Sequence, residues 1–354
     1  MPTVELAACQ VLVTEDDYAS QARFEALLAR VGQRLDAGRS RDAEGGFAHP
    51  CLAVFPEMIG AFLPLVGNAE AARGARTTDA ALARVALRSL PSLIGAMAHH
   101  GVWSPKVGFL LASAPEVWRL YRGAFARFAR AHVCWVVAGS ALLPRNAHGD
   151  RADRFEADDG RVYNTSFAFS PTGAQVGCVR KVHLVPTIED VLGLSSARAD
   201  ELTPFDAPFG RVGTLICYDG FRIAHTAQEP AFRPLAARYD AAGCSVLAQP
   251  AANPWPWEER WSFAEPGETL QRSEQWLSEG LLSQFAAAPF AHVRYAVTPQ
   301  LLGRVFDNRF DGRSHLLERG PAGARVLAEA ARADASLEAE EVVLRAVDLP
   351  AVAS

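Results

Sequence analysis

The stretch VELAACQVLV, residues 4–13, indicates the fold class when it is taken together with the helical pattern of the next segment. It is apolar and rich in β-branched residues, which predicts a strand, whereas residues 17–35 space their apolar side chains as an amphipathic helix does. Short apolar runs and longer helical patterns continue to alternate along the chain. Because such alternation is typical of α/β proteins, we expect an α/β fold.

The same patterns predict the other main elements. Further strands are expected at residues 52–55, 134–139, 163–169, 174–179, 212–217, 245–249, 292–297, 304–310, 315–318, 324–329 and 341–347. Helices are expected at residues 114–131, 224–242 and 268–287. Strands near both ends predict a single domain over residues 1–354, with insertions at about 60–112 and 145–160. The first of these could form a helical excursion over the sheet edge, serving as a lid or an oligomer contact, or as a neutral surface feature.

Composition excludes several classes of function. The 354 residues are 49% hydrophobic and 21% charged, with a formal net charge of -5, which is average for a globular protein. No block of like charge predicts binding to nucleic acid or to an anionic membrane. Residues 1–10 lack a cationic leader and no apolar run reaches 18 residues, so we expect a soluble cytoplasmic protein. The six scattered cysteines form no CxxC pair, which argues against a zinc site and favours reduced thiols.

Three strand ends carry side chains that could do chemistry together. Glu57 follows the apolar run of residues 52–55, Cys217 ends the run of residues 212–217, and Lys181 ends the second strand of an expected hairpin over residues 162–181. In α/β sheets, ligands collect beyond the carboxyl ends of strands. A thiol facing the N-terminus of a following helix would have a lowered pKa and act as a nucleophile. Taken singly, these residues could equally be a solvated glutamate, a packed core cysteine and a surface lysine.

Taken together, the three motifs resemble those of the nitrilase superfamily of carbon-nitrogen hydrolases, in the family's order. The resemblance extends from about residue 4 to 348. The motifs that carry it are Phe55-Pro56-Glu57, Arg180-Lys181-Val182-His183-Leu184, Leu215-Ile216-Cys217-Tyr218-Asp219, Val137-Ala138-Gly139-Ser140, Pro250-Ala251-Ala252-Asn253 and Phe310-Asp311-Gly312-Arg313-Ser314. It implies the α-β-β-α sandwich of this family, dimerising so that the layers stack.

The resemblance also implies roles for individual residues. Cys217 is similar to the family's nucleophile, Glu57 to its general base and Lys181 to the group that stabilises the oxyanion. Attack on an amide carbonyl produces a tetrahedral oxyanion, which a fixed cation or N–H donor stabilises, and the backbone N–H of Tyr218 is expected to be the second donor. Glu189, eight residues after Lys181, is expected as a catalytic or positioning carboxylate, or else as an ordinary helix-start glutamate.

Substrate-binding residues are expected in the segments after Cys217. Tyr218-Asp219 resembles the amidase branches more than the nitrilases, which usually carry Trp-Glu there. Arg222 could anchor a substrate carboxylate, as in N-carbamoyl amino acid amidohydrolases, or form a surface ion pair. Asn253, Trp255 and Trp257 could line an apolar pocket or merely pack their loop.

The function expected from the sequence is cysteine-dependent hydrolysis of a small linear amide, through a thioester and with release of ammonia or an amine. A nitrilase or an N-carbamoyl amino acid amidohydrolase is the nearest alternative, and a catalytically silent binding scaffold is the alternative from another class. We expect no cofactor and no metal, a small-molecule amide or nitrile as the partner, no nucleic-acid or membrane partner, and a homodimer or higher homo-oligomer.

Overall fold

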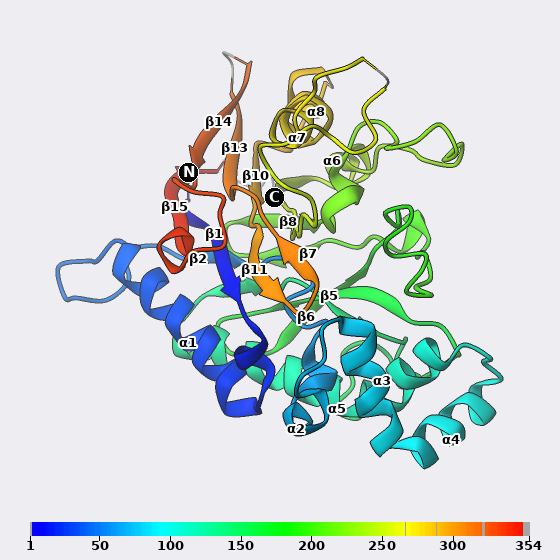
Figure 1. The fold of residues 1–354 in the computed structure, drawn as a ribbon. Helices are drawn as coiled ribbons and strands as arrows, with labels where there is room; N and C mark the ends of the chain where they lie inside the picture. Colours follow the sequence, from blue (N-terminus) through cyan, green and yellow to red (C-terminus); the bar gives the residue numbers. More distant parts are fainter. Residues whose placement is uncertain (1, 266, 288, 321–322, 350–354) are drawn as a thin grey trace.

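The computed structural model describes residues 2–265, 267–287, 289–320 and 323–349. Within them, fifteen strands form one sheet of nine strands and one of six (Figure 1). The strands are β1 (Thr3–Val13), β2 (Cys51–Val54), β3 (Trp135–Val137), β4 (Ala141–Leu143), β5 (Tyr163–Phe169), β6 (Gln175–Arg180), β7 (Phe205–Ala207), β8 (Gly210–Thr214), β9 (Cys244–Ala248), β10 (Tyr295–Thr298), β11 (Leu301–Val305), β12 (Asn308–Phe310), β13 (His315–Gly320), β14 (Gly323–Glu329) and β15 (Glu341–Asp348).

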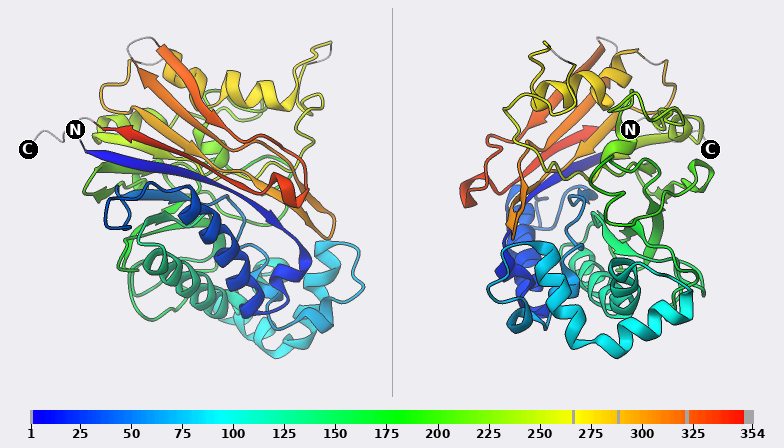
Figure 2. Two further views of the ribbon diagram at one scale, coloured as in Figure 1. Left: turned by 90° about the vertical axis from the view of Figure 1, so that its left-hand side faces the viewer. Right: turned by 45° about the vertical axis from the view of Figure 1, so that its right-hand side comes forward.

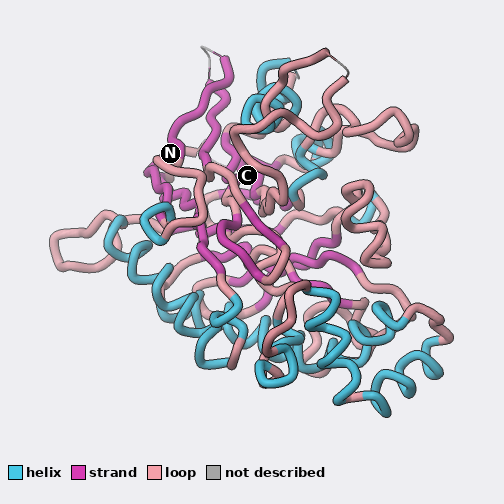
Figure 3. The backbone as a smooth tube through the Cα atoms, in the orientation of Figure 1, coloured by secondary structure: helices cyan, strands magenta, loops and turns pink. Residues whose placement is uncertain are grey.

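Helices and short 3₁₀ turns connect these strands (Figure 3). The helices are α1 (Gln21–Gly38), α2 (Ala69–Ala72), α3 (Thr78–Arg88), α4 (Leu90–His100), α5 (Pro105–Ala131), α6 (Ala236–Ala241), α7 (Arg272–Glu279) and α8 (Leu281–Ala287). The 3₁₀ turns are η1 (Glu15–Tyr18), η2 (Leu63–Leu65), η3 (Ala199–Glu201), η4 (Cys217–Gly220) and η5 (Leu337–Ala339).

Strand β1 shows why the two sheets stack. Successive side chains of a strand point to opposite faces, so a strand that is apolar on both faces must be covered on both. On β1, Cys9 and Val11 pack with the helices α1 and α5, whereas Leu6 and Ala8 pack against residues of the six-stranded sheet. The central position of β1 therefore results from the apolar side chains on both of its faces.

The layers are completed by helices on the two outer faces (Figure 2). Helices α1 and α5 cover the nine-stranded sheet, whose order is β12-β11-β1-β2-β3-β5-β4, with β15 pairing β1 and β6 pairing β5. Helices α6 and α8 cover the six-stranded sheet, ordered β14-β13-β10-β9-β8-β7. The expected α-β-β-α sandwich is confirmed.

Several expected elements differ from the structure. The strand expected at residues 212–217 is β8, which ends at Thr214, so Cys217 lies in the turn η4. The strand expected at residues 304–310 is a hairpin of β11 and β12, because Phe306 has a φ of 54° and turns the chain. In the helix expected at residues 224–242 only α6 forms, since Pro230 and Pro234 cannot donate the backbone hydrogen bonds of a helix interior. The helix expected at residues 268–287 is broken into α7 and α8 at Gly280.

The expected helical excursion at residues 60–112 is present as η2, α2, α3, α4 and the start of α5, and Figure 1 shows these helices together at one edge of the molecule. In the described ranges, no single helix combines the length and hydropathy that a membrane span requires. Helices α3 and α4 meet that test only when they are counted together, and they are bent by 94° at their junction.

Candidate active site

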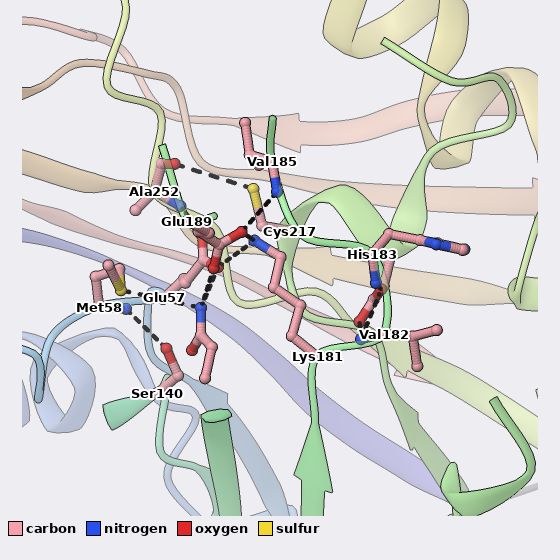
Figure 4. Close-up of polar contacts among 12 residues, drawn as sticks. Glu57, Met58, Ser140, Lys181, Val182, His183, Val185, Glu189, Cys217 and Ala252 are labelled. Atoms are coloured by element: carbon pink, nitrogen blue, oxygen red, sulfur yellow. Dashed lines mark hydrogen bonds and ion pairs between the residues drawn. The ribbon is translucent and has the colours of Figure 1, made fainter. Parts of the chain in front are cut away.

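The three strand ends singled out in the sequence meet between the two sheets (Figure 4). Glu57 lies just after β2, Lys181 directly follows β6, and Cys217 begins the turn η4 after β8. Glu57 and Lys181 thus come from the nine-stranded sheet and Cys217 from the six-stranded one. Stacking the sheets is what brings the thiol to the two charged groups.

A buried ion cluster holds Glu57, Lys181 and Glu189 together. Lys181 Nζ donates to Glu57 Oε1 at 2.7 Å and pairs with Glu189 Oε2 at 2.6 Å. The lysine side chain is 1% exposed and each carboxylate side chain 4%. Glu57 Oε2 also accepts from the backbone N–H of Ala252 at 3.2 Å, and Glu189 Oε2 from that of Val185 at 2.9 Å. Burial of a charge is tolerated only with such partners.

Asn164 completes this cluster and is a residue that the sequence analysis missed. Its side-chain Nδ2 donates to Glu57 Oε1 at 2.8 Å and to Glu189 Oε1 at 2.9 Å. Lys181 also donates its backbone N–H to the Asn164 carbonyl at 2.9 Å, because β5 and β6 pair antiparallel at this point. The signal that could have revealed Asn164 was its position across the expected hairpin from Lys181.

The backbone at Cys217 is held in an unusual conformation. Its φ of 49° lies in the left-handed region, which non-glycine residues seldom occupy outside functional or turn positions. The Cys217 N–H donates to Pro250 O at 2.7 Å and its carbonyl accepts from Gln249 Nε2 at 2.8 Å. The same Gln249 side-chain Nε2 lies 2.2 Å from where a Cβ would stand on Gly220, so a larger residue at 220 would displace Gln249 from this hydrogen bond. The Cys217 Sγ is 3.9 Å from Ala252 O.

Asp219 ties the cysteine turn to the lysine segment. Its carboxylate accepts the backbone N–H of His183 at 2.7 Å and that of Val182 at 3.2 Å. Asp219 is fully buried, and burial raises its carboxyl pKa to about 7, against the opposing effects of these hydrogen bonds and of Lys181. Asp219, two residues after Cys217, therefore positions the segment that directly follows Lys181.

The electrostatics of the cluster favour a neutral thiol and a proton-accepting carboxylate. Burial, followed by the charge of Glu57, raises the pKa of the Cys217 thiol. This corrects the expectation of a lowered pKa: the segment that Cys217 begins is the four-residue turn η4, not the expected helix, and burial dominates. Burial also raises the pKa of Glu57, against the lowering effect of Lys181. Burial lowers the pKa of Lys181, but the two carboxylates outweigh it and the net pKa is raised. Lys181 is therefore a permanent cation.

The cluster opens into a cavity of about 550 Å³, which Glu57, Lys181, Glu189 and Cys217 all line. This volume is within the range of small-molecule sites. Arg272, the first residue of α7, also lines the cavity and was missed in the sequence. Its guanidinium is buried, donates to Asn253 Oδ1 at 2.8 Å and to Gln275, and lies 3.9 Å over the ring of Trp261. Burial lowers its pKa to about 9.

The expected substrate-binding residues separate into two groups. Trp255 lines the cavity, and Asn253 lies behind it as the acceptor that orients Arg272. The Tyr218 side chain points elsewhere, since its hydroxyl bonds to Glu229 Oε2 at 2.9 Å and to the His225 N–H at 2.5 Å. Arg222 is exposed and is not a lining residue, and Trp257 packs in the core.

Among the residues described, no group of three or more His, Cys, Asp or Glu side chains is arranged to hold a metal ion. All six cysteines are free thiols.

Part of this site lies in a segment that is similar to a known family. Residues 111–223, which include Lys181, Glu189 and Cys217, match the family model for carbon-nitrogen hydrolases. Omega-amidase NIT2 of Homo sapiens is 38% identical over 104 residues, which are 27% of this chain and 33% of that protein. Hydrolase C26A3.11 of Schizosaccharomyces pombe is 35% identical over 114 residues, 29% of this chain and 32% of that protein. The chain thus spans about a third of the length of these curated relatives.

Solved structures share the fold over nearly the whole chain. A carbon-nitrogen hydrolase from Helicobacter pylori G27 superimposes with a TM-score of 0.56 and 13% identity, covering 98% of this chain and 89% of that one. A mutant amidase from Nesterenkonia sp. AN1, which shows covalent addition of the acetamide moiety of fluoroacetamide at its active site cysteine, gives a TM-score of 0.52, 12% identity, and coverage of 98% and 90%. The resemblance to carbon-nitrogen hydrolases is confirmed, in sequence over residues 111–223 and in fold over nearly the whole chain.

Proposed function

We propose that the protein is a cysteine-dependent hydrolase of the amidase type, which cleaves the C–N bond of a small-molecule amide and releases ammonia or an amine. The observation that carries the proposal is the buried cluster of Glu57, Lys181 and Glu189, which lines the same cavity as the Cys217 thiol. Similarity of the segment 111–223 to carbon-nitrogen hydrolases, and to a relative named an omega-amidase, supports it.

In the first half of the reaction, the Cys217 Sγ attacks the amide carbonyl carbon while its proton passes to the Glu57 carboxylate. Burial raises the pKa of the Cys217 thiol, so the thiol is protonated and needs a base. Burial also raises the pKa of Glu57, which makes its carboxylate a better proton acceptor. The new S–C bond leaves a negative charge on the carbonyl oxygen, for which Lys181 is the nearest fixed cation in the cluster and the Tyr218 backbone N–H a second donor. Collapse of this intermediate breaks the C–N bond, and Glu57 returns its proton to the leaving nitrogen.

In the second half, a water molecule attacks the thioester carbon and gives its proton to Glu57. The S–C bond breaks, the carboxylic acid leaves, and the Glu57 proton returns to the Cys217 sulfur. Glu189 takes no part in the proton transfers and positions the lysine through its 2.6 Å ion pair. Glu57 therefore moves one proton in each half of the cycle, and atoms and charge balance without a cofactor.

Acyl-enzyme formation tests this proposal. The protein would be incubated with short amides, N-carbamoyl amino acids, nitriles and a p-nitrophenyl ester, whose good leaving group makes acylation less dependent on the base. We expect an acyl adduct on Cys217 by intact mass and peptide mapping, with more adduct in Glu57→Gln because water attack is slowed. Cys217→Ala should form none, whereas the matched variant Cys178→Ala, which removes another free thiol, should behave as wild type.

The same experiment separates the alternatives. Release of acid and ammonia from nitriles in preference to amides would identify a nitrilase, and preference for carbamoyl compounds an N-carbamoyl amidohydrolase. Absence of any adduct, together with a Cys217 that resists iodoacetamide near neutral pH, would overturn the proposal and leave a catalytically silent binding scaffold.

A further inference from the structure

The cavity beside Cys217 is far larger than the reacting groups require. At about 550 Å³ it is many times the volume of a water molecule, about 30 Å³ in the liquid. The charged groups Glu57, Lys181, Glu189 and Arg272 line it together with the thiol. Most of the remaining wall is hydrocarbon, with no comparable set of buried polar groups among the described lining residues. The space therefore has a polar reacting region and an apolar extension.

The apolar extension is built largely by the helices at residues 60–112. Helix α3 contributes Leu82 and Ala86, one turn apart. Further hydrocarbon comes from Phe62, which directly precedes η2, from Leu93 of α4 and from Phe109 of α5. On α3 the neighbouring side chains Ala81 and Val85 are buried in the core, so the core holds the helix while Leu82 and Ala86 face the cavity. Figure 1 shows α3 and α4 outside the two sheets, where they can shape a cavity without altering the catalytic strands.

The outer part of the cavity carries no unbalanced charge among the described lining residues. Asp79 and Lys106 both line it, and they pair with each other at 2.9 Å. Leu87, at the end of α3, lines the cavity and is 69% exposed, so hydrocarbon reaches the solvent-facing side. A ligand group lying here would lose water without gaining an ionic partner, which favours an apolar group over a charged one.

We propose that this extension binds an elongated, apolar acyl chain, and that the substrate is a neutral amide whose carbonyl lies at Cys217 and whose chain runs toward α3. The inference rests on the proposed function, and it names the substrate class. Each methylene removed from water contributes about 0.8 kcal/mol, which corresponds to roughly a fourfold gain in kcat/KM per methylene. The gain should continue until the chain fills the cavity and then cease.

Arg272 favours a different substrate, one that carries a carboxylate. It is a buried guanidinium in the reacting region, bonded to the neutral side chains of Asn253 and Gln275, and a short substrate with a carboxylate close to its amide would suit it. Amides with a terminal carboxylate therefore belong in the test. The apolar-chain proposal requires a neutral amide to be preferred to a carboxylated amide of the same length.

The experiment measures ammonia release from straight-chain primary amides of two to ten carbons, and from the matching amides with a terminal carboxylate. Ala86→Trp places an indole in the cavity and should lower the octanamide-to-acetamide ratio of kcat/KM by at least ~10-fold, the value of about two methylenes. Ala80→Trp puts the same side chain on α3 at a position that does not line the cavity, and should leave the ratio unchanged. Leu82→Ala enlarges the cavity and should move the optimum to longer chains, which keeps the proposal testable if Ala86→Trp does not fold.

Binding to Cys217→Ala distinguishes failure of this inference from failure of the proposed function. Calorimetry should detect octanamide with a negative heat-capacity change and tighter binding than acetamide, and Ala86→Trp added to Cys217→Ala should remove the difference. Tighter binding of octanamide, combined with no hydrolysis of any amide by the wild-type protein, would contradict only the hydrolase proposal. Equal binding of the two amides, a chain-length series that is flat, or a preference for carboxylated amides would overturn the apolar-chain inference.

Discussion

Asn164 is expected to set the pH range in which Glu57 can accept a proton. Its Nδ2 donates one hydrogen bond to Glu57 and one to Glu189, both buried carboxylates. A hydrogen bond to a charged group contributes about 1.5–3 kcal/mol, and about 1.4 kcal/mol corresponds to one pKa unit. Asn164→Ala should therefore raise the pKa of Glu57 by about one unit, because the ionised form loses a donor. Since both bonds are lost, the free energy of unfolding should fall by about 3 kcal/mol or more.

The assay is the pH dependence of kcat/KM for the best amide, with the rate of Cys217 alkylation by iodoacetamide as a readout that needs no substrate. In both, the acid limb should move to higher pH by about one unit, since the base must be ionised. Asn146→Ala is the matched control: it removes an asparagine whose Nδ2 donates to Arg154 O at 2.8 Å, outside the site. Asn146→Ala should lower the free energy of unfolding and leave the acid limb of the pH profile at its wild-type position. An acid limb that does not move in Asn164→Ala would refute the role assigned to this side chain.

Further predictions concern the charges around the nucleophile. Lys181→Met should lower the free energy of unfolding by roughly 3–5 kcal/mol at pH 8, because two buried carboxylates lose their cation. Chemical denaturation measures this loss. An equal loss at pH 5, where carboxyl groups can protonate, would contradict this cause. The pKa of Asp219 is about 7 when folded and 3.8 ordinarily, so its contribution to stability is complete below about pH 4 and is lost as the pH rises through 7. Asp219→Asn should therefore flatten the stability curve between pH 4 and 7, and parallel curves for variant and wild type would argue against it. Arg272→Met should slow alkylation of Cys217 at pH 8, since the guanidinium charge lowers the thiol pKa, whereas the exposed Arg222→Met should not; equal rates in the two variants would count against this effect.

The strand ends were the most predictable part of the site. Glu57, Lys181 and Cys217 each follow or end a stretch whose pattern predicts a strand, and ligands collect beyond the carboxyl ends of strands in α/β sheets. The breaks at Pro230 and Gly280 also have local causes that the sequence contains. The fold class and the three residues Glu57, Lys181 and Cys217 could therefore be predicted from local sequence patterns.

The rest depends on contacts between distant segments. Arg272 reaches the cavity at the end of a long irregular loop, and no period in the sequence predicts where such a loop leads. The thiol pKa of Cys217 was predicted with the wrong sign because burial depends on the stacking of two sheets, which the strand itself does not reveal. The cavity could not be predicted either, because it forms where α3 and α5 pack, and their apolar residues have the sequence pattern of ordinary core residues.

The pairing of β1 with β15 also governs when this protein can finish folding. Thr3 lies beside Asp348 and Gln10 beside Glu341, so β1 cannot pair with this neighbour until the chain more than 300 residues further on has been synthesised. At about 5–20 residues per second, some tens of seconds separate the two on a ribosome. During that interval one edge of β1 is open to any other extended chain, which is a known hazard for aggregation. Production of the protein should therefore depend more on chaperones, which can cover this edge until β15 is available, than its stability would suggest.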